Sequence, residues 1–151
     1  MRVLNYLLLS LFLLGGCTSV FGQDYSNKSV QELLPLAEKG DAKAQYRLGL
    51  TYSNDIDVPQ DFQEAAKWDQ LAAEQGHAYA QYNLGVMYKD GEGVSQDYVL
   101  AHKWFNLAAN QGLKSPAKGR DDLAKKMTPS QIQESQQLTR EFKPKKEKSK
   151  K

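Results

Sequence analysis

Apolar and small residues recur at helical spacing in residues 78–89 and again, after a polar turn, in residues 97–110. The first set consists of Ala80, Leu84, Gly85, Met87 and Tyr88. The second set consists of Val99, Leu100, Ala101, Trp104, Leu107 and Ala108. Steps of three and four residues place each set on one helical face. Glycines at 91 and 93 end the first helix, so the pattern predicts an αα-hairpin, with a helix A and a helix B.

The same hairpin pattern occurs twice, because residues 42–77 and 78–113 align without a gap. They share 18 of 36 residues, and the shared positions include the helix A glycines Gly49 and Gly85 and the helix B tryptophans Trp68 and Trp104. A period of this length predicts small helical units stacked on one another. Glycine inside a helix costs about 1 kcal/mol relative to alanine, so we expect another helix to pass close to both glycines. We expect both tryptophans to pack between the units.

The turn of the first repeat lacks glycine, since residues 54–57 are Asn-Asp-Ile-Asp where the second repeat has Asp-Gly-Glu-Gly. Asparagine and aspartate tolerate the left-handed conformation best after glycine, so we expect the turn to be preserved. Asp61 and Asp97 are expected to cap the two B helices.

Partial units flank the two repeats. Ser29 and Glu32 form a capping pair ahead of a short helix, in which Pro35 disfavours a long uninterrupted run. Thr128, Pro129 and Gln131 mark the start of a last helix. We therefore expect an all-α, αα-hairpin repeat solenoid, with two full repeats and capping helices. Its parts are a signal peptide (1–22), an N-terminal cap (23–41), the repeats (42–77 and 78–113), a C-terminal partial repeat and capping helix (114–142) and a disordered lysine-rich tail (143–151).

The motif Ala-x-Ala-Gln-x-x-Leu-Gly-x-x-Tyr, followed by a Gly-x-Gly-Val turn, Lys-Trp and Ala-Ala, resembles the Sel-one-like repeat (SLR) family, a relative of the tetratricopeptide repeat. The resemblance covers residues 42–113 and implies a right-handed solenoid used for protein–protein interaction. One branch of that family, the cysteine-rich Helicobacter proteins, is linked to penicillin binding and weak β-lactamase activity and has a disulfide in every repeat. Neither repeat here contains cysteine, so that activity is not carried over.

In a solenoid of this kind, the helix A residues that point away from helix B line the concave surface. These positions, with two neighbouring polar ones, are the predicted partner-binding residues: Lys43, Tyr46, Arg47, Leu50, Tyr79, Tyr82, Asn83, Val86 and Lys89. Tyrosine is enriched among the residues that anchor interfaces. Tyr46 and Tyr82 recur in both repeats, however, so packing between units is the alternative role for them.

The charge of the chain is unevenly distributed. Residues 143–151 contain six lysines, whereas residues 23–142 carry more acidic than basic side chains. An acidic body argues against binding of nucleic acid, which requires a clustered basic face.

The N-terminus reads as an export signal, with Arg2 followed by a short apolar run and small residues. Two cleavage sites fit. Residues 14–17 resemble a lipobox, in which Cys17 would be lipidated, while residues 20–22 resemble an ordinary signal-peptidase site. Cys17 is the only cysteine of the chain. We expect an exported protein that is periplasmic, anchored to the outer membrane through Cys17, or secreted.

Residues suited to catalysis are scarce. The histidines His77 and His102 lack metal-ligand spacing, and no phosphate-binding loop is present. We expect a non-catalytic interaction scaffold of the bacterial envelope that binds a protein or peptide partner and uses no cofactor or metal. The alternative, a β-lactamase-like envelope enzyme, would need an activated nucleophile.

Overall fold

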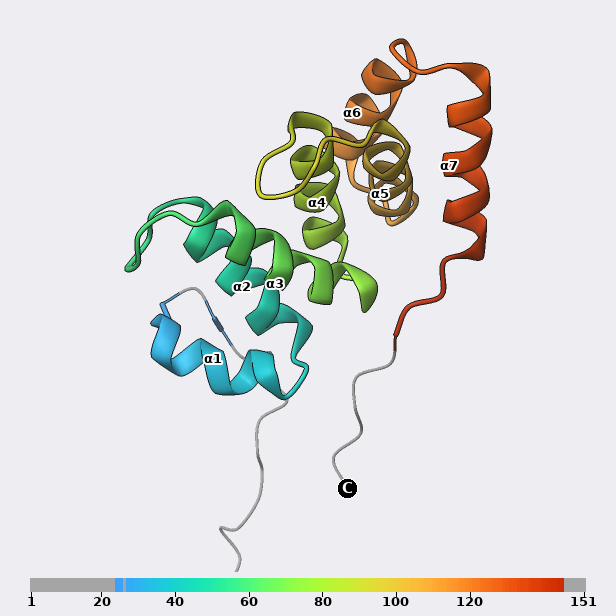
Figure 1. The fold of residues 1–151 in the computed structure, drawn as a ribbon. Coiled ribbons are helices and arrows are strands. Elements are labelled where there is room, and N and C mark those ends of the chain that lie inside the picture. Colours follow the sequence, from blue (N-terminus) through green and yellow to red (C-terminus); the bar gives the residue numbers. More distant parts are fainter. Residues whose placement is uncertain (1–23, 26, 146–151) are drawn as a thin grey trace, which may run out of the picture.

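The computed structural model describes residues 24–25 and 27–145, and within them it contains seven helices and no strand (Figure 1). The helices are α1 (Val30–Glu38), α2 (Ala42–Ser53), α3 (Phe62–Glu74), α4 (Ala78–Asp90), α5 (Tyr98–Asn110), α6 (Lys114–Ala124) and α7 (Pro129–Glu141). The predicted signal peptide, Cys17 and the tail beyond residue 145 lie outside the described residues. None of the described helices is long and apolar enough to cross a bilayer.

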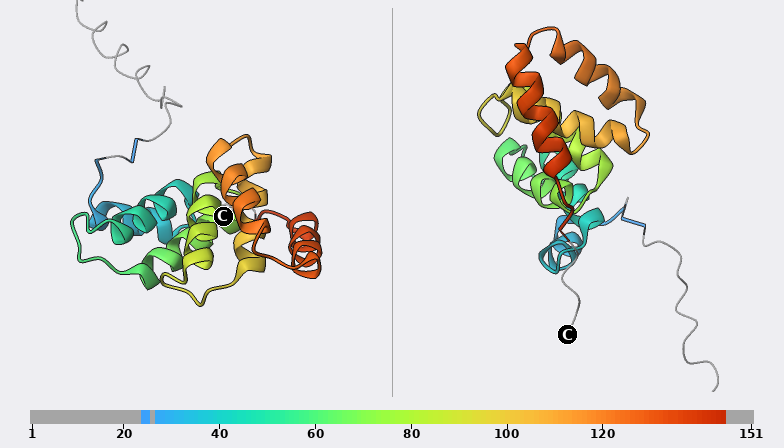
Figure 2. Two further views of the ribbon diagram at one scale, coloured as in Figure 1. Left: turned by 90° about the horizontal axis from the view of Figure 1, so that it is seen from above. Right: turned by 90° about the vertical axis from the view of Figure 1, so that its right-hand side faces the viewer.

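The helices form stacked hairpins. Helices α2 and α3 pair within the first repeat, α4 and α5 pair within the second, and the contacts of α3 with α4 join the two units. The units follow one another from α1 at one end to α6 and α7 at the other (Figures 1 and 2). The all-α repeat solenoid expected from the sequence is confirmed.

Glutamines shared by the two repeats connect consecutive units. Within each repeat, two glutamines bond to each other: Gln75 donates to Gln45 at 2.7 Å, and the equivalent Gln111 donates to Gln81 at 2.8 Å. Gln45 and Gln81 are buried, and each donates its own side-chain N–H to a carbonyl of the preceding helix. The identical glutamines thus satisfy buried polar groups at each junction.

The predicted caps and turns are present. Asp61 accepts hydrogen bonds from the first turn of α3, and Asp97 does the same for α5. Asp55 and Asp57 have φ values of 54° and 62°, at the positions where the second repeat has Gly91 and Gly93 with 74° and 71°. Aspartate therefore reproduces the left-handed backbone that glycine supplies in the second turn.

Side chains of the B helices approach the two helix A glycines. A Cβ at Gly49 would lie 2.7 Å from the carboxyl carbon of Asp69, and one at Gly85 would lie 2.6 Å from the ring of Phe105. The close approach that the sequence predicted is confirmed, and it is made by the partner helix of the same hairpin. Trp68 and Trp104 are buried, as expected for packing residues.

The terminal elements match their expected arrangement only in part. Helix α1 continues through Pro35, although the proline was expected to limit it. Helix α7, at the position of the expected capping helix, packs mainly against α5. Residues 143–145, expected to belong to a disordered tail, lie against the end of α3, where the Lys145 amide donates to the Glu74 carbonyl at 2.8 Å.

Candidate protein-interaction surface

The predicted partner-binding residues lie on α2 and α4, and they differ in exposure. Lys43 and Tyr79 are exposed. Tyr79 is the most prominent, because 54% of its surface is accessible although it is a large aromatic residue. The other seven are half-buried: Tyr46, Arg47, Leu50, Tyr82, Asn83, Val86 and Lys89.

An aromatic cluster lies where α2 meets the start of α4. The rings of Tyr46 and His77 stack with centroids 4.6 Å apart, and Tyr79 lies 6.1 Å from Tyr46 and 6.4 Å from His77. His77 is also the N-cap of α4, where its Nδ1 accepts from the Ala80 amide at 3.3 Å. These contacts hold Tyr46 in the junction, so its ring supports the exposed Tyr79.

Tyr82 packs in the interior of the second unit. Its ring lies 5.9 Å from Phe105, and both Tyr82 and Val86 border the apolar cluster formed by Phe105, Ala101 and Leu123. For Tyr82, the geometry therefore matches the packing alternative that the sequence left open.

A buried carboxyl group lies beneath Asn83, one of the predicted partner-binding residues. Asp69 of α3 is fully buried, and the Asn83 side-chain amide donates to its Oδ2 at 3.2 Å. Its other oxygen, Oδ1, has no hydrogen-bond partner among the described residues. Burial raises the pKa of Asp69 from 3.8 to about 8, and the hydrogen bond from Asn83 opposes that rise. The group is therefore held largely protonated at neutral pH.

Burial also shifts the titration of the aromatic cluster. It raises the pKa of Tyr46, and nearby Asp69 adds to the rise. It lowers the pKa of His77, and the charge of Lys43 acts in the same direction. The cluster is thus uncharged at neutral pH and presents an aromatic surface beside one lysine.

Reasoning from the sequence missed Asp69. A signal was available, because Asp69 and Phe105 occupy equivalent positions in two otherwise similar helices. A carboxyl group that replaces a large apolar residue at a repeated position marks a place where the two units differ in their interior.

His102 forms a buried hydrogen-bonded group with α7. Its Nδ1 lies 2.7 Å from the Ser135 hydroxyl and 3.0 Å from the Asn106 side-chain amide. Ser135 is fully buried and also donates to the Ile132 carbonyl. The buried Ser135 hydroxyl is closed off from solvent and substrates. Its hydrogen bond to His102 joins α7 to α5.

Two adjacent acidic side chains of α6 form local ion pairs. Asp121 pairs with Arg120, and Asp122 pairs with Lys125. Within the described residues, no group of three or more histidine, cysteine, aspartate or glutamate residues could hold a metal ion.

Stacked αα-hairpins define an α-solenoid repeat protein, a class that recognises other proteins through extended surfaces. This chain belongs to the Sel1 repeat family: residues 42–77 and 78–113 each match the Sel1 repeat. Proteins built from these repeats are in general non-catalytic interaction scaffolds.

The solved structures similar to the chain include two Sel1-type repeat proteins. One is c5321, a protective antigen of uropathogenic Escherichia coli strains with an SLR fold; it is 35% identical over 74% of this chain, with a TM-score of 0.71. The other is a Sel1 repeat protein from Oxalobacter formigenes, 38% identical over 62% of this chain and 70% of its own length, with a TM-score of 0.60. This chain spans only 24% of c5321. No curated protein matches the sequence.

Proposed function

We propose that this chain is a non-catalytic scaffold of the bacterial cell envelope that binds a protein partner through the surface formed by α2 and α4. The observation that carries the proposal is the exposed ring of Tyr79 on the cluster of Tyr46 and His77. A rigidly supported aromatic ring loses little conformational entropy on binding, which makes it a suitable anchor for an interface.

The surroundings of Tyr79 favour a polypeptide as the partner. Lys43 adds an exposed cation near the neutral cluster. An aromatic anchor beside one cation fits an apolar side chain of the partner together with a carboxylate or a backbone carbonyl. The surface covers only two full repeats, so modest affinity is expected.

The envelope location rests on the sequence of residues 1–22, which lie outside the described part of the chain. An apolar run with a lipobox-like cysteine supports export and attachment to a membrane through Cys17. Cell fractionation of the native protein and of Cys17→Ser tests this. Release of the variant from the membrane fraction is expected for a lipoprotein, whereas an unchanged membrane fraction would contradict lipid attachment.

The binding proposal is tested by pull-down from cell envelopes with the native protein, with Tyr79→Ala and with Ile56→Ala. Ile56 is also exposed, at 45%, but it lies in the turn between α2 and α3 and serves as the matched control. We expect one partner to be retained by native protein and Ile56→Ala and lost with Tyr79→Ala. Equal retention by both variants would contradict the proposed surface.

A further inference from the structure

The described part of the chain ends with an extended segment, residues 142–145, that runs back over two helices. We call this segment the strap. The Phe142 ring meets the Trp104 ring edge-on at 5.7 Å, and the Lys103 ammonium lies 4.3 Å from the Trp104 ring centroid. At the other end of the strap, Lys145 donates its amide to the Glu74 carbonyl and pairs with the Glu74 carboxylate. Figure 2 shows the strap leaving α7 and passing toward the end of α3.

The 36-residue repeat produces a second copy of the surface that receives the strap. The strap contacts Glu74, Lys103 and Trp104, and Pro144 lies against Gly76. The residues at the equivalent positions one repeat earlier are Glu38, Lys67, Trp68 and Gly40. The lysine–tryptophan contact also recurs, with the Lys67 ammonium 5.7 Å from the Trp68 ring.

In the structure this second copy is an open groove. It has a volume of about 420 Å³ and is lined by residues that include Glu38, Gly40, Trp68, Leu71, Gln75 and Lys145. Leu71 is 39% exposed there, which makes it one of few large apolar side chains open to solvent. The Trp68 indole Nε1–H is buried without a hydrogen-bond partner among the described residues.

The charges of the groove select a basic occupant. Glu38 is exposed, and no described cation pairs with it, whereas the equivalent Glu74 pairs with Lys145. The Glu38 carbonyl accepts no hydrogen bond from the described backbone outside helix α1, while the Glu74 carbonyl accepts one from the strap. A lysine bound in the groove would thus meet the carboxylate and the carbonyl of Glu38, which are equivalent to the Glu74 groups that Lys145 contacts.

We propose that this groove binds an extended segment of a partner protein with the pattern aromatic–x–Pro–Lys, seated as Phe142–Lys145 is seated one repeat later. The aromatic ring packs on Trp68 and Leu71, the proline lies over Gly40, and the lysine pairs with Glu38. The chain's own residues 146–151 contain neither an aromatic residue nor a proline, so they cannot supply this pattern. The groove is formed mainly by α1 and α3 and is separate from the Tyr79 surface.

The test is a fluorescence-anisotropy titration of the full chain into a labelled peptide with the sequence of residues 141–147. Short peptides in shallow grooves bind weakly, so we expect saturable binding with a Kd of about 100 μM. Replacing the peptide phenylalanine by alanine should weaken binding at least tenfold. Absence of saturable binding up to millimolar protein overturns the proposal.

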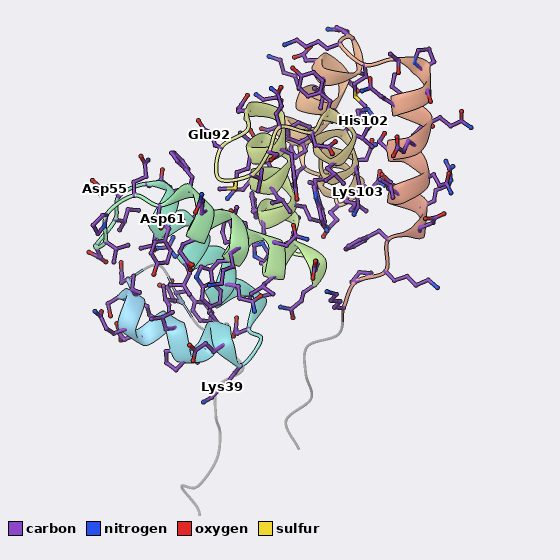
Figure 3. The ribbon with its side chains drawn as sticks, viewed as in Figure 1. Lys39, Asp55, Asp61, Glu92, His102 and Lys103 are labelled. Atoms are coloured by element: carbon purple, nitrogen blue, oxygen red, sulfur yellow. The ribbon has the colours of Figure 1, made fainter. Side chains whose placement is uncertain are left out.

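Two exposed positions locate the binding site. Leu71→Asp should abolish binding and Glu38→Lys should weaken it at least tenfold, while Glu92→Lys, the same charge change on the distant α4–α5 turn, should leave it unchanged (Figure 3). Circular dichroism and thermal melting check that each variant folds. Binding that survives both Leu71→Asp and Glu38→Lys would place the peptide elsewhere and overturn the proposal.

The peptide affinity of a chain that ends at Lys145, compared with that of the full chain, shows whether the groove is open to a partner or filled by residues 146–151. Unchanged affinity is expected if the groove is open to a partner segment. Affinity at least tenfold higher for the shortened chain would show that residues 146–151 already occupy the groove, and it would overturn the proposal.

Discussion

The side-chain amide of Asn83 donates to the Asp69 carboxyl group at 3.2 Å, at the same place in the repeat where Gly119 faces Phe105 in the next unit. At each junction between units, a side chain of helix B thus faces one residue of the following helix A. At the first junction this is the polar pair of Asp69 and Asn83, and at the second it is the Phe105 ring facing Gly119. The two repeats therefore share most of their buried residues, such as Leu48 and Leu84, but differ at this interior position.

The first prediction concerns the pH dependence of stability. Because burial raises the pKa of Asp69 to about 8 in the folded state, the folded protein keeps a proton that the unfolded chain releases above pH 3.8. The contribution of Asp69 is therefore fully present below that pH and is lost as pH rises toward 8. Asp69→Asn should stabilise the protein by about 2 kcal/mol at pH 7.5 and have little effect at pH 4.

Thermal melting of the native protein and the variant from pH 4 to pH 8.5 measures this difference. Burial lowers the pKa values of His77 and His102, so their contribution to stability changes with pH in the opposite direction. They are present in both proteins, so their contribution cancels in the difference. A pH-independent difference between the two melting curves would contradict the assignment.

The second prediction concerns the glycine beneath Phe105. A Cβ at Gly85 would lie 2.6 Å from the Phe105 ring, which is 1% exposed and would have to shift to admit the methyl group. Gly85→Ala should therefore lower the free energy of unfolding by about 2 kcal/mol. Gly119→Ala is the matched control, since its Cβ would lie 3.3 Å from the same ring and the helix gains about 1 kcal/mol from alanine. Urea denaturation of both variants checks this, and equal losses would contradict it.

The third prediction separates packing from binding among the tyrosines. Tyr82→Ala should lower the free energy of unfolding by about 2 kcal/mol, because it removes a ring that packs on Phe105. Tyr79→Ala should change it by less than about 0.5 kcal/mol, because that ring is mostly exposed. Chemical denaturation gives both values. A large loss of stability in Tyr79→Ala would show that this ring packs within the fold.

The fourth prediction concerns the strap. A chain that ends at Glu141 loses the Phe142 ring over Trp104 and should be less stable by about 1–2 kcal/mol. A chain that ends at Lys145 keeps every described strap contact and should match the full chain. Thermal melting of the two shortened chains distinguishes them, and identical curves would show that the strap contributes nothing to stability.

The hairpins, their caps and their turns could be predicted from the sequence because each depends on residues near one another in the chain. Asp97 caps the helix that begins one residue later, and Asp55 reproduces a glycine conformation within a single turn. The repeat also predicted the contacts between hairpins, because a unit that cannot bury its own apolar face must stack on the next one.

The remaining features depend on contacts between residues that are distant in sequence. Periodicity placed Tyr46 and Tyr82 on a stripe of helix A, but their half-burial comes from His77 and Phe105 in other elements. Composition favoured disorder after Phe142, because the following residues are mainly lysine. Residues 143–145 are ordered through Glu74, which lies 71 residues before Lys145.

The strap also affects local unfolding at the C-terminal end of the repeat array. A terminal unit that touches only its neighbour can fray by itself, because its opening breaks a single interface. Here, peeling α7 from α5 also breaks the link between Lys145 and Glu74 at the end of the first repeat. The C-terminal end therefore opens together with that contact, and amide hydrogens in α7 should exchange with solvent more slowly than they do in a chain that ends at Glu141.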